Sequence, residues 1–159
     1  MTENKTILTI DASEGQKLSI AGGNYRIVIS GKQTNGKFAV IEMSVPPGAG
    51  PNPHSHADFA ESFYVLEGEV AFKSELGNYV AKKGSFINIP EGGIVHGFKN
   101  LSTIPAKLLC TVIPAGLDEF FQELAEYLTL NSNAEIDKIK SISEKFGQKL
   151  YPENYLDSN

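Results

Sequence analysis

Apolar and polar residues alternate in short runs through the N-terminal two thirds of the chain, up to residue 114. Successive side chains of an extended strand point to opposite faces, so this alternation predicts strands that bury one face. Glycine, proline and asparagine interrupt the runs at intervals typical of a β-sandwich or a β-barrel. We expect about ten short strands, most clearly in the ranges 17–21, 25–30, 38–45, 63–66, 70–72, 79–81, 85–89, 94–98 and 106–113.

The hydrophobic period changes after residue 114, where apolar positions recur three or four residues apart. This spacing places them on one stripe of an amphipathic helix. The first such stripe consists of Leu117, Phe120, Phe121, Leu124 and Leu128. Its simplest role is to pack the helix against the barrel wall or against a partner subunit.

A second helix is expected to begin at Ser132, because Glu135 follows three residues later in the pattern of a capping box. Gly147 marks its end, since glycine adopts the conformation that closes a helix. Its apolar stripe consists of Ile136, Ile139, Ile142 and Phe146. The pattern therefore predicts an all-β barrel over residues 1–114, with residues 115–159 as a C-terminal helical appendage of the same domain.

Composition and charge exclude several function classes. The 159 residues carry a formal net charge of -5 and contain no cluster of lysine or arginine, which argues against a nucleic-acid partner. No apolar run is long enough to span a bilayer, and residues 1–5 lack the layout of a secretory signal. The single cysteine, Cys110, lies in an apolar run that predicts a buried, unreactive thiol. We expect a cytoplasmic protein with neither a nucleic-acid nor a membrane partner.

The candidate chemistry lies in three histidines and one glutamate. His54 and His56 occupy alternate positions, so on a strand their rings point to the same side. Glu61 follows shortly after, and His96 is the remaining histidine of the sequence. Three imidazoles and a carboxylate suit a divalent transition metal and leave positions for water, substrate or dioxygen. A structural zinc site is the weaker alternative, because such sites use cysteine.

The stretch around the first two histidines resembles a known protein family. It follows the spacing of the first cupin motif, a glycine, a His-x-His pair, a glutamate and a second glycine, at Gly48, His54, His56, Glu61 and Gly68. The chain is similar to small single-domain cupins of the quercetin-dioxygenase-like kind. The resemblance covers roughly residues 36–114.

The second cupin motif is matched further along the sequence. Its glycine, proline, glycine, histidine and asparagine correspond to Gly84, Pro90, Gly93, His96 and Asn100. The segment between Pro90 and His96 is one residue longer than the usual pattern. We therefore expect the loop to differ in shape, while His96 keeps its usual spacing to Asn100.

The resemblance implies a fold and a set of residue roles. The fold is a double-stranded β-helix, or jelly-roll, barrel with a metal held inside it. Carried over residue by residue, the metal ligands are His54, His56, Glu61 and His96, and Glu61 is also the candidate catalytic base. The cofactor implied is one divalent transition metal ion, and iron, manganese, nickel, cobalt, copper and zinc all accept imidazole ligands.

The same resemblance implies a reaction. In flavonol dioxygenases the 3-hydroxyl of the substrate loses its proton, dioxygen attacks, and the heterocycle opens with loss of carbon monoxide. A dioxygenase for a flavonol or another enolisable aromatic substrate is therefore expected, as a homodimer, the commonest assembly of soluble oligomers. Two alternatives stay open: a metal-dependent isomerase or lyase that uses no oxygen, and a small-molecule-binding module without catalysis.

Aromatic residues near the motifs are candidates to line a pocket for an aromatic substrate, although a barrel interior needs large apolar residues in any case. These candidates are Phe63, Tyr64, Phe72 and Phe98. Asp58 lies between the expected ligands in the sequence. At its spacing from Glu61, the side chain of Asp58 should point away from the expected ligands, so we expect a solvated loop residue.

Overall fold

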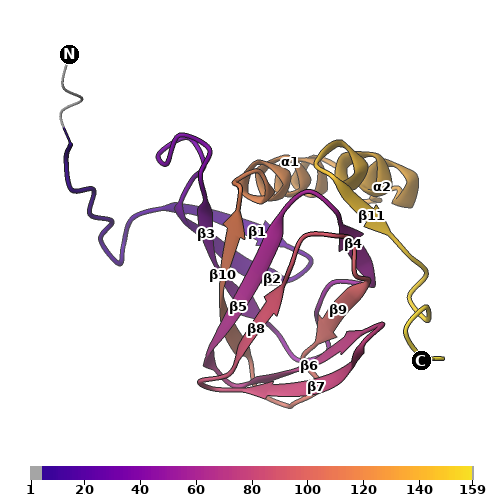
Figure 1. The fold of residues 1–159 in the computed structure, drawn as a ribbon. Coiled ribbons are helices and arrows are strands. Elements are labelled where there is room, and N and C mark those ends of the chain that lie inside the picture. Colours follow the sequence, from indigo (N-terminus) through magenta and orange to yellow (C-terminus); the bar gives the residue numbers. More distant parts are fainter. Residues whose placement is uncertain (1–4, 159) are drawn as a thin grey trace.

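The computed structural model describes residues 5–158 as two antiparallel sheets that face each other, with two helices at one end (Figure 1). The six-stranded sheet has the order β1-β2-β3-β10-β5-β8, and the five-stranded sheet has the order β11-β4-β9-β6-β7. The predicted jelly-roll barrel with two C-terminal helices is confirmed. The strands are β1 (Gln16–Ile20), β2 (Gly23–Ile29), β3 (Ala39–Val45), β4 (His54–His56), β5 (Ala60–Glu67), β6 (Glu69–Ser74), β7 (Gly77–Lys82), β8 (Phe86–Ile89), β9 (His96–Lys99), β10 (Ala106–Ile113) and β11 (Gln148–Leu150).

The core of the barrel follows from the alternation in the sequence. In β3 and β10 every second side chain is buried, and the two strands pair so that Cys110 lies opposite Ile41 and Leu108 opposite Met43. Directly opposed residues of an antiparallel pair project from the same face of the sheet. Each fully buried aliphatic side chain stabilises the fold by about 1.5–3 kcal/mol. The inward face of these central strands therefore anchors the barrel.

Strand β4, which carries two of the histidines, is positioned by the loop that precedes it. A Cβ atom on Gly50 would overlap the carbonyl oxygen of Phe98 in β9, and Gly50 has a φ of 150°. Both facts require glycine at this position. The close approach brings β4 alongside β9, where His54 is the antiparallel partner of His96.

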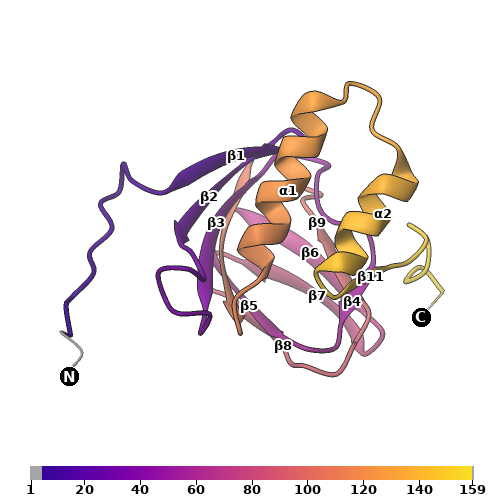
Figure 2. The same cartoon turned by 90° about the horizontal axis from the view of Figure 1, so that it is seen from above.

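Helix α1 (Leu117–Leu130) packs its predicted stripe against the barrel, and Figure 2 shows it lying across the strands. Leu117, Phe120, Phe121 and Leu124 are buried, and Leu128 is half-buried. The carboxylate of Asp118 accepts hydrogen bonds from the backbone N–H groups of Gly31, at 2.8 Å, and Gly116, at 3.1 Å. The start of α1 is thereby tied to the loop between β2 and β3.

Helix α2 (Ile136–Lys145) begins later than the sequence pattern predicts. Glu135 is its N-cap residue, in an extended conformation and without a side-chain capping bond, and Ser132 lies outside the helix. The backbone N–H of Glu135, which a capping box assigns to Ser132, instead donates to the Tyr127 hydroxyl at 2.9 Å. The predicted capping box is therefore wrong, because a contact with α1 satisfies that donor. Ile136, the first residue of the predicted stripe, is largely exposed.

Strand β11, which follows α2, has no counterpart in the sequence prediction. It pairs antiparallel with β4, so that Gln148 lies opposite His56 and Leu150 opposite His54. The segment that follows the helices thus returns to the sheet that carries all three histidines. Glu153, which follows β11, forms an ion pair with Lys99 of β9 at 2.9 Å on the outer surface. Exposed pairs of this kind contribute at most about 1 kcal/mol to stability.

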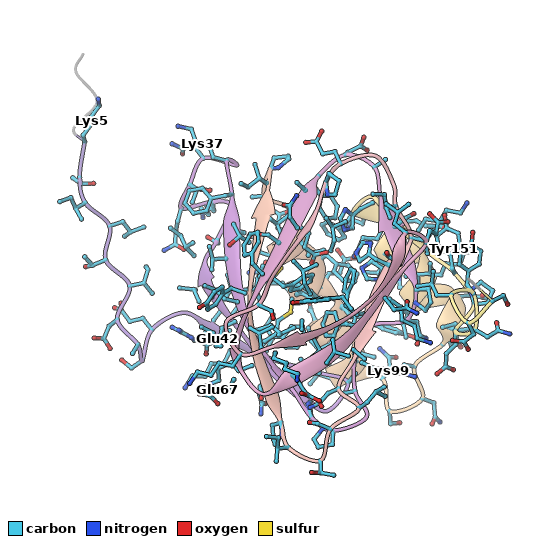
Figure 3. All side chains as sticks on the ribbon, turned by 60° about the horizontal axis from the view of Figure 1, so that its bottom comes forward. Lys5, Lys37, Glu42, Glu67, Lys99 and Tyr151 are labelled. Atoms are coloured by element: carbon cyan, nitrogen blue, oxygen red, sulfur yellow. The ribbon has the colours of Figure 1, made fainter. Side chains whose placement is uncertain are left out.

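Most charged side chains lie on the outside of the barrel, as Figure 3 shows for Lys37, Glu42 and Glu67. This placement is the polar half of the alternating pattern. None of the helices in residues 5–158 combines the length and the apolar content needed to cross a membrane.

Candidate metal centre

The structure brings His54, His56, Glu61 and His96 together inside the barrel. Each is buried, and one potential ligand atom from each lies within 4.8 Å of all the others. The histidines come from β4 and β9 of one sheet, and Glu61 comes from β5 of the other. The structure therefore brings these four side chains together as expected, and Glu61, Phe63 and Val65 share the buried face of β5.

Backbone carbonyl groups fix the orientation of all three imidazole rings. In each ring Nδ1 lies within hydrogen-bond distance of a carbonyl oxygen, and since a carbonyl can only accept, Nδ1 carries the proton. The pairs are His54 Nδ1 with Asn52 O at 2.9 Å, His56 Nδ1 with Phe59 O at 2.9 Å, and His96 Nδ1 with Ile94 O at 2.8 Å. A neutral ring held in this way presents the Nε2 lone pair, which is the form that binds a metal.

The inner nitrogen atoms and the carboxylate need a positive charge between them. Glu61 Oε2 lies 3.1 Å from His56 Nε2 and 3.6 Å from His96 Nε2. With Nδ1 protonated, a neutral ring has only a lone pair to offer the carboxylate, and two acceptors facing each other repel. His96 Nε2 is buried without a hydrogen-bond partner among the described residues. A bound cation would satisfy every one of these groups, so the donor set fits a transition metal.

The protonation states at the site favour ligation. Burial alone raises the pKa of the Glu61 carboxyl. In the metal-free protein a proton on the Nε2 atom of His56 or His96 can take the place of the cation and be donated to the carboxylate, and these hydrogen bonds outweigh burial and hold that pKa below its usual value. Burial, together with the neighbouring His96, lowers the pKa of His54 to about 4. At neutral pH the site therefore offers an ionised carboxylate and an uncharged His54 ring, as metal binding requires.

Cys110 forms a hydrogen bond with the Glu61 carboxylate. It is fully buried, and its thiol donates to Glu61 Oε1 at 3.3 Å. Burial raises the pKa of the Cys110 thiol, and the charge of Glu61 raises it further. The predicted burial of Cys110 is confirmed. Its contact with Glu61 gives it a positioning role that the sequence did not indicate.

A cavity of about 300 Å³ opens from this cluster toward the helices. His54 and Glu61 form part of its wall, and the stripe of α1 closes another side with Phe120 and Phe121. Glu61 is the only Asp, Glu, Lys or Arg among the described residues that line it. The α1 stripe, expected only to pack against other surfaces, therefore also shapes the space in front of the candidate ligands.

The aromatic candidates for substrate contact have different positions. Phe63 and Phe98 line the cavity and pack edge to face, with ring centroids 5.4 Å apart. Phe72 is buried and stacks on His96 at 6.1 Å, so it supports a candidate ligand and does not line the cavity. Tyr64 is 44% exposed on the outer face of β5, and the structure does not bring it to the site. Asp58 is exposed, as expected.

Three residues at the site were not singled out from the sequence. Besides Cys110, these are Tyr25 of β2 and Gln148 of β11, which both line the cavity. Burial raises the pKa of the Tyr25 phenol, with Cys110 and Glu61 adding to the effect, so its hydroxyl stays protonated. The alternation of side chains along β2 could have indicated that Tyr25 points inward. The sequence pattern contained nothing that would have placed Gln148 at the cavity.

Comparison with known proteins agrees with this geometry. Residues 41–112 match the family model Cupin_2, described as a cupin domain. These residues match a cupin domain and have its barrel fold. The match includes all four candidate ligands, and the resemblance to quercetinase-like cupins is confirmed.

The chain is 27% identical over 117 residues to quercetin 2,3-dioxygenase of Bacillus subtilis. The match includes 74% of this chain and 34% of that protein, so the protein described here spans about a third of the relative's length. The activity of that relative therefore does not transfer directly to this chain.

Solved structures show the same fold. A predicted oxalate decarboxylase from Thermotoga maritima aligns with a TM-score of 0.59 and 23% identity, covering 67% of this chain and 99% of that one. KdgF from Halomonas sp. aligns with a TM-score of 0.62 and 18% identity, covering 72% and 99%. At these identities the likeness establishes the cupin barrel and leaves the chemistry to the site itself.

Proposed function

We propose that the protein is a metal-dependent dioxygenase that opens a flavonol-like or other enolisable aromatic substrate with dioxygen. The observation that carries this proposal is the position of Glu61. It is a buried, ionised carboxylate beside two imidazole nitrogens, in the wall of a cavity that has no other charged side chain among its described residues. A carboxylate so placed is suited to take the proton of an acidic hydroxyl group.

The residues that would hold the cofactor are His54, His56, Glu61 and His96, and their buried convergence supports this choice. A divalent transition metal held there would supply Lewis acidity and reactivity toward dioxygen. The reaction balances without an external reductant, because both oxygen atoms of dioxygen stay in the opened product while one carbon leaves as carbon monoxide.

The residues of the protein supply positioning and proton transfer. Oε2 of Glu61 accepts the proton of the substrate hydroxyl, while Oε1 stays bonded to the Cys110 thiol. Phe63 and Phe98 offer apolar faces and edges for an aromatic ring. Helix α1 covers one side of the cavity, which limits the contact of the site of proton transfer with bulk water.

The cavity lining favours an uncharged substrate over a small anion. A dicarboxylate or a phosphate ester is bound in proteins through arginine or lysine, and neither residue type occurs among the residues that line the cavity. A volume of about 300 Å³ lies at the lower end of the range for small-molecule pockets. Both facts support a compact, mostly apolar ligand over the substrates of a sugar-phosphate isomerase or an oxalate decarboxylase.

The proposal is tested by oxygen uptake. Metal-free protein is loaded separately with manganese, iron, cobalt, nickel, copper and zinc, and oxygen consumption is followed with quercetin. We expect oxygen uptake with at least one redox-active metal, with carbon monoxide as a product. Uptake should be lost in Glu61→Gln but not in Asp58→Asn, which alters an exposed acid in the loop between β4 and β5. Full metal occupancy without oxygen uptake in every case contradicts the proposal, and turnover under anaerobic conditions favours a lyase or isomerase. The expected homodimer and cytoplasmic location stay predictions.

A further inference from the structure

Gln148 occupies an unusual position for a residue in a C-terminal segment. It is the first residue of β11 and lies directly opposite His56 of β4. Opposed residues of an antiparallel pair project from the same face of the sheet with their Cβ atoms about 5 Å apart. The Gln148 side chain therefore points to the same inner side of the barrel as the imidazole of His56.

The amide group of Gln148 lacks a partner in the protein. The residue is 6% exposed, and its Nε2 forms no hydrogen bond with any of residues 5–158. Buried amide nitrogens in native proteins are normally paired, and an exception calls for a reason. An amide nitrogen is a donor, so the missing partner is a hydrogen-bond acceptor.

The cavity supplies the place for such an acceptor. Gln148 lines it together with Glu61, which reaches it from the opposite sheet. A molecule in the cavity therefore lies between a candidate proton acceptor on one side and an unpaired amide donor on the other. The surrounding walls are formed largely by apolar side chains such as Phe63, Phe98 and Phe121.

We propose that Gln148 is a substrate-binding residue, whose amide N–H donates a hydrogen bond to a carbonyl or hydroxyl oxygen of the molecule in the cavity. This inference rests on the proposed use of that cavity as the substrate site. The ligand class is a neutral aromatic compound with an oxygen acceptor on the edge remote from Glu61. The hydrogen bond fixes the rotation of the ring, so that its acidic hydroxyl faces the carboxylate. A segment outside residues 41–112, which match the cupin model, then determines specificity.

The test compares equilibrium binding of a defined probe to matched variants. The probe is quercetin, which carries hydroxyl groups on its outer rings, remote from its acidic 3-hydroxyl. It is titrated by fluorescence into the zinc-loaded protein, where no oxygen chemistry takes place. Gln148→Met keeps the length of the side chain and removes the amide. Gln122→Met makes the same change on α1, where the glutamine bonds Gln16 outside the cavity. Zinc content and the urea midpoint of unfolding are measured for each protein.

We expect Gln148→Met to bind the probe about three- to tenfold more weakly than wild type, with unchanged zinc content and an unchanged or higher urea midpoint. Gln122→Met should bind like wild type. Equal affinity in Gln148→Met overturns the inference, as does a lower urea midpoint, which would reveal a structural partner for the amide. Absence of binding to the wild-type protein also overturns it. The two proposals can fail separately. If Gln148→Met alone binds the probe more weakly but no metal form of the protein consumes oxygen, the binding role of Gln148 is upheld and the proposed dioxygenase activity is refuted.

Discussion

Cys110 and Glu61 form a hydrogen-bonded pair in the interior of the barrel, with the thiol sulfur 3.3 Å from the carboxylate Oε1. The two residues belong to the neighbouring strands β10 and β5. The other carboxylate oxygen, Oε2, faces the Nε2 atoms of His56 and His96. The thiol therefore holds one carboxylate oxygen, and the direction in which Glu61 presents the lone pairs of the other oxygen to the candidate metal centre depends in part on the cysteine.

Removing the thiol donor should destabilise the metal-free protein. Cys110→Val keeps a small apolar side chain but leaves Glu61 Oε1 without its donor, at a cost of about 1–3 kcal/mol in the free energy of unfolding. Cys110→Ser, which retains a donor, should lose less. Urea denaturation measures both. A Cys110→Val protein as stable as wild type would show that the pair contributes nothing.

The thiol itself should resist modification. Cys110 is fully buried, and burial raises its pKa, so the native protein presents almost no thiolate to a reagent. We expect Ellman's reagent at pH 8 to react with the native protein at least about tenfold more slowly than with protein in urea. Rapid stoichiometric labelling of the native protein is incompatible with the buried position.

Loss of a single imidazole should empty the candidate metal centre. His54→Ala and His96→Ala each remove one of the three Nε2 donors, and we expect both to lose most of the bound metal in elemental analysis. Asp58→Asn serves as the control, because this exposed acid lies outside the cluster and should keep full occupancy. Full occupancy in both alanine variants refutes the ligand assignment.

Stability of the metal-free protein should depend on pH through His54. Burial lowers its pKa to about 4 in the folded state, against the ordinary 6.5. Between these values the unfolded protein binds a proton that the folded protein does not, so stability rises with pH across this window. The full effect is about 3 kcal/mol. Urea midpoints measured from pH 4 to pH 7 should rise, with a shallower slope in His54→Gln. An identical slope in that variant would assign the dependence to other groups.

Glycine at position 50 should be essential to the fold. Gly50→Ala introduces a Cβ atom against the Phe98 carbonyl at a φ of 150°, and should lower the free energy of unfolding by more than about 2 kcal/mol. Gly36→Ala provides the control, because Gly36 also has a positive φ but no atom lies near its missing Cβ. We expect a loss of about 1 kcal/mol there. Equal urea midpoints in the two variants would contradict the close approach.

Local rules predicted much of the barrel. The strand over 106–113 was predicted with the bounds that the structure shows, because Leu108, Cys110 and Val112 alternate without interruption. The start of α2 was predicted wrongly at Ser132, because the hydroxyl of Tyr127, in another helix, takes the place of the expected cap. A hydrogen bond between segments that meet only in the folded protein leaves no trace in a local pattern.

The amino-acid sequence alone determined the strand alternation, the cupin motifs and the identity of the three histidines and the glutamate that would converge. These features are periodic or have fixed spacing, so short-range geometry suffices to read them. The tertiary structure decided which side chains complete the site. Cys110 reaches Glu61 because of the register between β10 and β5, and Gln148 reaches the cavity because β11 returns to β4. Strand pairing across many residues depends on the packing of the whole barrel, which no local segment encodes.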